Sequence, residues 1–147
     1  MLSKKAKVLQ KLAGKSLLEH ILCSAEEISS KTSIVVGFDK LSVEKEVSKI
    51  STKAKTYEQK KQIGTADAVR TVIDSINENE KVLILYGDVP LISKNTLKSL
   101  CSLNNSVSIL TTNLSDPKGY GRVIKDAKSL VVEIIEEKDT SAEQKEI

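Results

Sequence analysis

The segment KVLILYGDVPLI, residues 81–92, combines a continuous apolar run with one acidic residue, Asp88. The run is too apolar for a strand with one face in water, so it predicts a strand that is buried on both faces, as in a parallel sheet covered by helices. Ligands of open α/β sheets bind outside the carboxyl ends of the strands. Asp88 therefore lies where a ligand is expected, although an Asp turn ahead of Pro90 explains the same residues.

The rest of the chain alternates between helical and strand patterns. Apolar residues at steps of three and four predict helices at 15–28, 41–50, 65–76 and 93–103, with Thr65 as the N-cap of the third. Shorter runs predict strands at 33–37, 54–59 and 106–114, and residues 121–126 and 130–139 are expected to pair as an antiparallel hairpin. This order predicts an α/β fold with a mostly parallel sheet and helices on both faces.

Composition limits the class of protein. The 147 residues are 39% hydrophobic and contain no repeat or low-complexity tract, which suits one globular core. The net charge of +3 comes from interspersed charges, and the chain has one Phe, three Tyr and no Trp, so nucleic-acid binding is not expected. No apolar run approaches the ~18 residues of a membrane span, and the basic N-terminus lacks a signal-peptide core. We expect a cytoplasmic protein with Cys23 and Cys101 buried and reduced.

Two further motifs carry residues suited to ligand binding. In EQKKQIGTADAV, residues 58–69, the Gln59 amide can donate and accept as a nucleobase edge requires, and Gly64 and Thr65 open a helix whose free N–H groups suit anions. An ordinary glycine loop with a threonine cap fits the same residues. In DPKGYGRV, residues 116–123, the glycines either admit a ligand close to the main chain or form a tight turn.

Five segments together resemble one known family over practically the whole chain. In order they are KVLQKLAGKSLLEHIL, EQKKQIGTADAV, LYGDVPLI, DPKGYGRV and IIEEKDTSAEQKEI. They resemble the uridyltransferase domain of bacterial N-acetylglucosamine-1-phosphate uridyltransferase/glucosamine-1-phosphate acetyltransferase. The resemblance implies a Rossmann-like nucleotidyltransferase fold and a Mg²⁺-assisted reaction of UTP with N-acetylglucosamine 1-phosphate. The products would be pyrophosphate and UDP-N-acetylglucosamine, a precursor of peptidoglycan and lipopolysaccharide.

The resemblance also implies roles for individual residues. Lys7 would meet the nucleotide phosphates, and Asp88 would bind Mg²⁺. The other positions share three roles: uracil recognition by Gln59, Gly64 and Thr65, lining of the Asp88 site by Tyr86 and Gly87, and contact with the sugar by Gly121 and Glu136. Lys7 is also one lysine of a basic N-terminal segment, and Glu136 is one of several glutamates near the end of a predicted strand.

The sequence departs from the family at both ends and at Asp67. Family members begin with a strand and a Gly-rich loop of the form LAAGxGTRM, and this sequence starts at about the last residue of that motif, Met1. It ends before the family's second metal ligand and its β-helical acetyltransferase domain, so residues 1–147 are expected to form a partial nucleotidyltransferase domain. Asp67 replaces a histidine and adds negative charge near the expected triphosphate.

Two functional readings remain open for this sequence. One is a segment of an enzyme. The other is a non-catalytic remnant that binds a uridine nucleotide or sugar, or a module that a partner chain completes. An oligomer is possible in either case.

Overall fold

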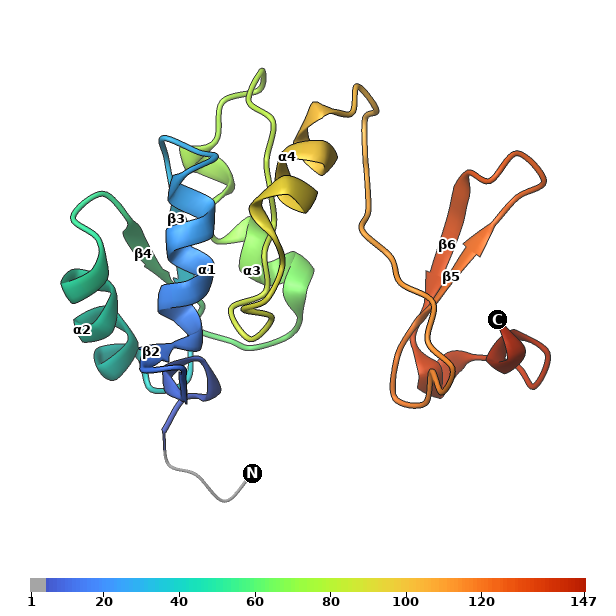
Figure 1. The fold of residues 1–147 in the computed structure, drawn as a ribbon, viewed down its shortest axis with the longest axis horizontal. Helices are drawn as coiled ribbons and strands as arrows, with labels where there is room; N and C mark the ends of the chain where they lie inside the picture. Colours follow the sequence, from blue (N-terminus) through green and yellow to red (C-terminus); the bar gives the residue numbers. More distant parts are fainter. Residues whose placement is uncertain (1–4) are drawn as a thin grey trace. The chain divides into compact units, whose positions relative to one another are not determined.

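The computed structural model describes residues 5–147, which divide into two compact units, residues 5–104 and residues 105–147. The first unit holds all of the α-helices of the described chain, and the second holds an antiparallel hairpin (Figure 1). Met1, where the resemblance places the end of the Gly-rich motif, lies outside the described residues.

The first unit begins with a short hairpin that leads into a helix. After the 3-10 turn η1 (Lys7–Leu9), strands β1 (Lys11–Leu12) and β2 (Lys15–Ser16) pair in antiparallel fashion. Ala13 and Gly14 both have positive φ values, 49° and 85°, as a tight two-residue hairpin turn requires. Helix α1 (Leu17–Glu26) follows, and Ser16 Oγ caps it by accepting the Glu19 N–H at 3.1 Å. The predicted helix is confirmed.

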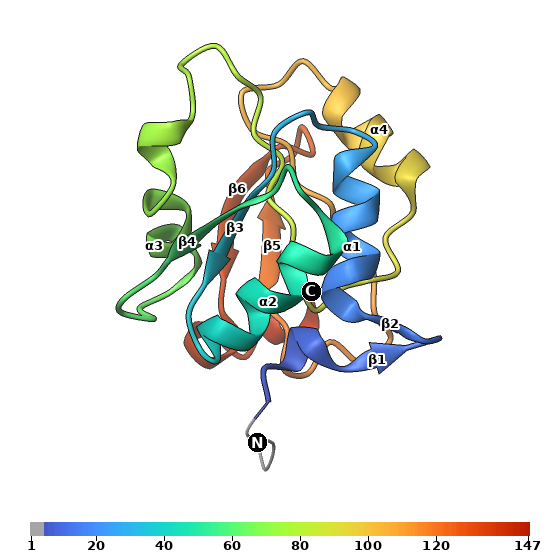
Figure 2. The same ribbon diagram turned by 90° about the vertical axis from the view of Figure 1, so that its left-hand side faces the viewer.

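A parallel strand pair forms the centre of the first unit. Strand β3 (Ser33–Val36) pairs with β4 (Lys55–Glu58), and helix α2 (Lys40–Ile50) connects them. Helices α1 and α2 contact each other, as Figure 2 also shows, and α2 contacts β3. The buried core draws on α1, β3, α2 and the segment around η1: Ala6, Leu9, Leu18, Val36, Val43 and Val47. Strand β4 contributes no fully buried residue. The helical and strand patterns of this part of the sequence thus correspond to the observed elements α1, β3, α2 and β4.

Helix α3 (Thr65–Arg70) differs from its prediction at both ends. Its N-cap is Gly64 with φ 129°, a conformation that glycine adopts readily, so Thr65 is the first helical residue and the N-cap prediction is wrong. The helix was also predicted to reach residue 76. Instead, the Thr71 hydroxyl donates to the Asp67 carbonyl at 3.0 Å, and a separate 3-10 turn η2 (Ile73–Ser75) follows. The adjacent β-branched residues Thr71 and Val72 disfavour a longer helix.

The apolar run at residues 82–85 is not part of a strand ladder among the described residues. Leu83 and Leu85 are half-buried, while Val82 and Ile84 are 52% and 53% exposed. The prediction of a strand buried on both faces is therefore wrong for this segment. Burial of both faces requires neighbouring strands as well as covering helices, and the parallel ladder of residues 5–147 contains only β3 and β4. Helix α4 (Lys94–Ser102) follows as predicted, capped by Ser93.

The second unit is built around the predicted hairpin. Strand β5 (Arg122–Lys125) pairs with β6 (Val131–Ile135) in antiparallel register, with an irregularity at Ile124/Lys125. Asp126 Oδ1 accepts the N–H groups of Lys128 and Leu130 and so holds the connecting turn. Short 3-10 turns η3 (Glu137–Asp139) and η4 (Gln144–Glu146) follow. Residues 106–114 join no ladder, so the strand predicted there is wrong.

The α/β class is confirmed, with a parallel strand pair, covering helices and a C-terminal antiparallel hairpin. Cys23 and Cys101 are free thiols, as expected, but neither is fully buried: Cys23 is exposed and Cys101 is half-buried. The burial of Cys23 was predicted wrongly because α1 turns Leu18, Ile21 and Leu22 toward the core and Cys23 away from it. In the part of the chain that the structure describes, no helix has the length and apolarity needed to span a bilayer.

Candidate functional site

Lys7 and Asp88 form an ion pair between residues 81 positions apart, with 2.8 Å from Lys7 Nζ to Asp88 Oδ2. Lys7 begins η1, and Asp88 lies in the turn that ends the extended apolar segment, where Val89 N–H donates to Tyr86 O at 3.2 Å. A Cβ on Gly87 would lie 3.0 Å from Val8 Cγ1, so the absence of a side chain there lets the two segments approach. The structure therefore joins two residues that the sequence placed in one site.

The pair is open to solvent. The side chains of Lys7 and Asp88 are 60% and 36% exposed, and ion pairs of this kind contribute little to stability. Their charges remain accessible, so the ammonium can meet phosphate oxygens and the carboxylate can meet a cation. The same turn carries Tyr86, which is exposed.

Asp39 fixes the segment that precedes Lys7 and was not predicted as a site residue. Its Oδ2 accepts the Ala6 N–H at 3.1 Å. Hydrogen bonds from the Ser42 side chain and the Ala6 backbone hold the pKa of Asp39 below its usual value. Asp39 is also the N-cap of α2 and has a positive φ of 56°, a conformation that Asp tolerates better than most residues. The contact joins residues 33 positions apart, so no local pattern reveals it.

The residues around Asp88 fit a magnesium ion held mainly by water and substrate. Residues 5–147 contain no group of three or more His, Cys, Asp or Glu side chains arranged for a metal. Mg²⁺, however, commonly takes only one or two carboxylates and completes its octahedron with water and phosphate oxygens. Among the described residues, Asp88 Oδ2 faces Lys7, while Oδ1 receives no hydrogen bond. Asp88 can therefore supply a single oxygen ligand.

The Gln59 amide is held by its own loop. Gln59 Nε2 donates to Gly64 O at 3.1 Å and to Asp67 Oδ2 at 2.9 Å. Both amide hydrogens are thus engaged, and the side-chain oxygen is the group left for a ligand. Thr65 lies beside this contact at the start of α3. The structure brings Gln59, Gly64 and Thr65 together. It also shows Asp67 as a hydrogen-bond partner of Gln59, whereas the sequence showed only that Asp67 replaces a histidine of the family.

Gly121 and Glu136 are neighbours in the second unit. A Cβ on Gly121 would lie 3.1 Å from the Ile135 carbonyl oxygen and 3.9 Å from Glu136 Cα, so the two chain segments meet closely. The next residue, Glu137, accepts the Gly119 N–H through Oε2. The structure thus places the two predicted sugar contacts side by side.

Arg122 holds the same loop and was missed by the sequence reasoning. It is only 4% exposed. Its guanidinium donates to Pro117 O at 3.1 Å, to Tyr120 O and to Lys145 O at 3.2 Å, while Nε is buried without a partner among the described residues. A buried arginine is rare enough to be informative, but burial is not visible in the string GYGRV.

Similarity to known proteins agrees with this organisation. A model of the MobA-like NTP transferase domain matches residues 2–123. The bifunctional protein GlmU of Thermoanaerobacter pseudethanolicus is 44% identical over 151 residues, which cover 100% of this chain and 33% of the relative. The proteins of the same name from Francisella philomiragia and Thermotoga petrophila are 43% and 41% identical over 149 and 150 residues, covering 100% of this chain and 32% and 33% of the relatives.

The chain thus spans about a third of the length of the curated relatives that it matches. The family match extends from before Lys7 through the Gln59 loop and the Asp88 turn to strand β5. It confirms the family resemblance drawn from the motifs. The chain belongs to the MobA-like NTP transferase domain family.

Proposed function

We propose that this nucleotidyltransferase domain joins UTP to N-acetylglucosamine 1-phosphate and releases pyrophosphate. The resemblance of its five motifs supplies the substrates, and the ion pair between Lys7 and Asp88 is the observation that carries the proposal. Both substrates and the product UDP-N-acetylglucosamine are soluble metabolites, so we also propose a cytoplasmic location.

The reaction needs positioning and charge neutralisation more than proton transfer. An oxygen of the sugar phosphate attacks the α-phosphorus of UTP and forms the new P–O bond, while the bond from the α-phosphorus to the bridging oxygen breaks and pyrophosphate leaves. Lys7 Nζ is a compact cation that can offset charge on the phosphate oxygens. Asp88 would hold a Mg²⁺ that, when bound, neutralises and aligns the phosphates.

The other candidate residues would orient the two substrates. In this proposal the free oxygen of Gln59 accepts the uracil N3–H, and the Gly64–Thr65 step lets the base approach the backbone. Gly121 and Glu136 would contact the N-acetylglucosamine moiety. Since Glu137 and Arg122 hold the loop around Gly121, they would position it without touching the reacting atoms.

A non-catalytic uridine-nucleotide-binding module is the second candidate. The hydrogen bond that Gln59 Nε2 donates to Asp67 Oδ2 argues against efficient turnover, because it engages an amide hydrogen that a base would otherwise receive. Asp67 also adds negative charge beside the proposed nucleotide. Both effects would lower nucleotide affinity and with it turnover.

Release of pyrophosphate from UTP, Mg²⁺ and N-acetylglucosamine 1-phosphate tests the proposal. The unsubstituted chain should release pyrophosphate, Asp88→Asn should lose most of the activity, and Asp74→Asn should retain it as a matched control at an exposed aspartate outside the site. Equal activity of the Asp88→Asn variant would refute the role of Asp88. Absence of turnover together with UTP-dependent thermal stabilisation would favour the binding module.

A further inference from the structure

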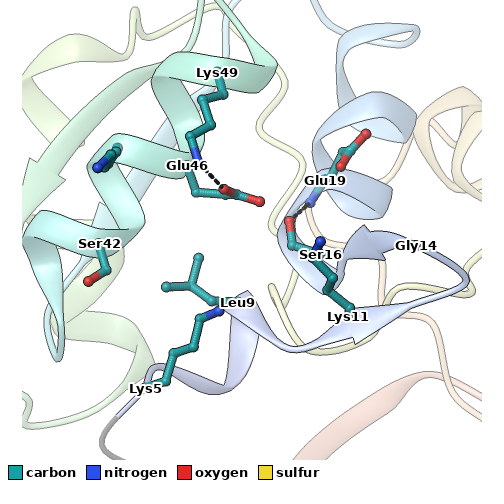
Figure 3. Close-up of a pocket in the computed structure, with 10 residues that line it drawn as sticks. Lys5, Leu9, Lys11, Gly14, Ser16, Glu19, Ser42, Glu46 and Lys49 are labelled. Atoms are coloured by element: carbon teal, nitrogen blue, oxygen red, sulfur yellow. Dashed lines mark hydrogen bonds and ion pairs between the residues drawn. The ribbon is translucent and has the colours of Figure 1, made fainter.

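A pocket of about 470 Å³ lies in the first unit between the β1–β2 hairpin, the start of α1 and helix α2 (Figure 3). Its volume falls within the ~300–1,000 Å³ that small-molecule sites usually occupy. The lining comes from three segments: Lys5, Leu9, Lys11, Gly14, Ser16, Glu19, Ser42, Lys45, Glu46 and Lys49. No residue of the proposed catalytic site is among them.

The charge of the pocket is positive. Four lysines and two glutamates line it, so the formal charge of the lining is +2. Lys45 and Lys49 lie one helical turn apart on α2, a like-charge spacing that is unfavourable in an isolated helix. Lys49 contacts Glu46 at 3.4 Å, whereas Lys11 and Lys45 have no ion pair with any residue of the described range. An anion between the hairpin and α2 would offset this repulsion.

The wall of the pocket is fixed by buried and hydrogen-bonded groups. Ser16 is 2% exposed, and its Oγ accepts the Glu19 N–H at 3.1 Å. A hydrogen bond from Ser16, helped by Lys49 and Lys5, keeps the pKa of Glu46 below its usual value, so Glu46 stays ionised and in place. Leu9 is buried beside them and closes one side. Figure 3 shows the Glu46 carboxylate and the Ser16 hydroxyl pointing toward each other.

We propose that this pocket binds a small phosphate-bearing anion at a site separate from the catalytic one. Lysine ammonium groups are compact point charges that suit phosphate oxygens, and here they come from opposite walls of one hollow. The pocket has room for a single small molecule, and the positive charge is confined to its lining. An extended polyanion would therefore fit it poorly. Lys5 precedes η1 and Leu9 ends it; Lys7 belongs to the same turn, but it is not among the residues that line the pocket.

Titration of the full chain with inorganic phosphate, followed by amide chemical shifts, tests this site. Saturable shifts are expected at Gly14, Ser16 and Leu9. The double variant Lys11→Gln/Lys45→Gln should bind phosphate about tenfold more weakly, which corresponds to the loss of two charge contacts. The double variant Lys53→Gln/Lys98→Gln removes the same charge from exposed positions outside the pocket and should bind like the unsubstituted chain.

Equal phosphate affinity of the two double variants would overturn the proposal, as would the absence of shifts at Gly14 and Ser16 in the unsubstituted chain. Shifts confined to the residues around Lys7 and Asp88 would also overturn it, because they would place phosphate in the proposed catalytic site alone. The single variant Lys45→Gln is a second variant for the same phosphate titration. It replaces one exposed lysine on α2 and leaves the hairpin that carries Lys11 unchanged.

Discussion

Replacement of Arg122 by methionine should selectively unfold the second unit. The guanidinium donates to three backbone carbonyls, two in the loop before β5 and one at Lys145 near the chain end. No other side chain among the described residues is recorded on these three oxygens. Methionine keeps much of the apolar stem but cannot donate a hydrogen bond. The substitution therefore leaves Tyr120 O and Lys145 O without a donor among the described residues, whereas Pro117 O keeps the Tyr120 N–H at 3.0 Å, and it introduces no new charge.

The cost can be worked out from these contacts. Loss of a charged donor costs about 1.5–3 kcal/mol per hydrogen bond. Tyr120 and Lys145 are exposed, so water replaces part of these contacts, and removal of the buried cation offsets a further part of the sum. A net loss of about 2–4 kcal/mol follows from the three hydrogen bonds. Small units of this size rarely gain more than roughly 3–5 kcal/mol from their core. The substitution should therefore remove most of the stability of residues 105–147.

Hydrogen exchange measured by mass spectrometry would detect the change unit by unit. Amides of β5 and β6 should lose their protection in Arg122→Met, while those of α1 and α2 keep theirs, because the structure divides into two compact units. Arg70→Met replaces the only other arginine, which is exposed on α3, and should leave both units protected. Unchanged protection of β5 and β6 in Arg122→Met would refute the reasoning.

Three further predictions follow from the contacts described above. Asp67→Asn keeps an oxygen for Gln59 but removes a charge near the proposed triphosphate, so UTP affinity measured by calorimetry should rise by roughly fivefold, about 1 kcal/mol; unchanged or weaker binding would contradict this. Hydrogen bonds hold the pKa values of Asp39 and Glu46 below their ordinary values near 4. Both carboxylates therefore stabilise the fold at a pH above those ordinary pKa values. That stabilisation is lost as the pH falls through the lowered pKa values of the folded state. The urea midpoint of the unsubstituted chain should therefore drop between about pH 5 and pH 3, and the midpoint of Glu46→Gln should drop less over the same range. An equal drop in both proteins would argue against the Glu46 contribution. In Gly121→Ala the new Cβ would meet the Ile135 carbonyl oxygen at 3.1 Å, so the hairpin should lose about 1–3 kcal/mol in the same exchange experiment, and full protection there would be inconsistent with the close approach.

Local signals in the sequence were sufficient for much of the fold. Ser16 and Ser93 precede apolar helical patterns, and both cap the helices that follow. The hairpin of β5 and β6 forms because its two apolar runs are adjacent and separated by a turn that Asp126 holds. These features depend on neighbours a few residues away, which a sequence pattern records directly.

Features that depend on distant residues were predicted less well. The pairing of residues 82–85 depends on which strands lie beside them, and the apolar pattern carries no information about that. The resemblance implied a phosphate role for Lys7 and a metal role for Asp88, and the contact between the two side chains is a finding of the structure. The contact between Gln59 and Asp67 and the burial of Arg122 could not be predicted, because each arises from how a loop folds back on itself.

The Mg²⁺ dependence of UTP binding tests the role of Asp88 most directly. Calorimetric titration with and without Mg²⁺ should show that the ion strengthens UTP binding by about tenfold or more in the unsubstituted chain and in Asp74→Asn, since the carboxylate ties the metal and its phosphates to the protein. In Asp88→Asn most of that enhancement should disappear. An enhancement of the same size in Asp88→Asn would show that the cation binds elsewhere and would contradict the proposed site.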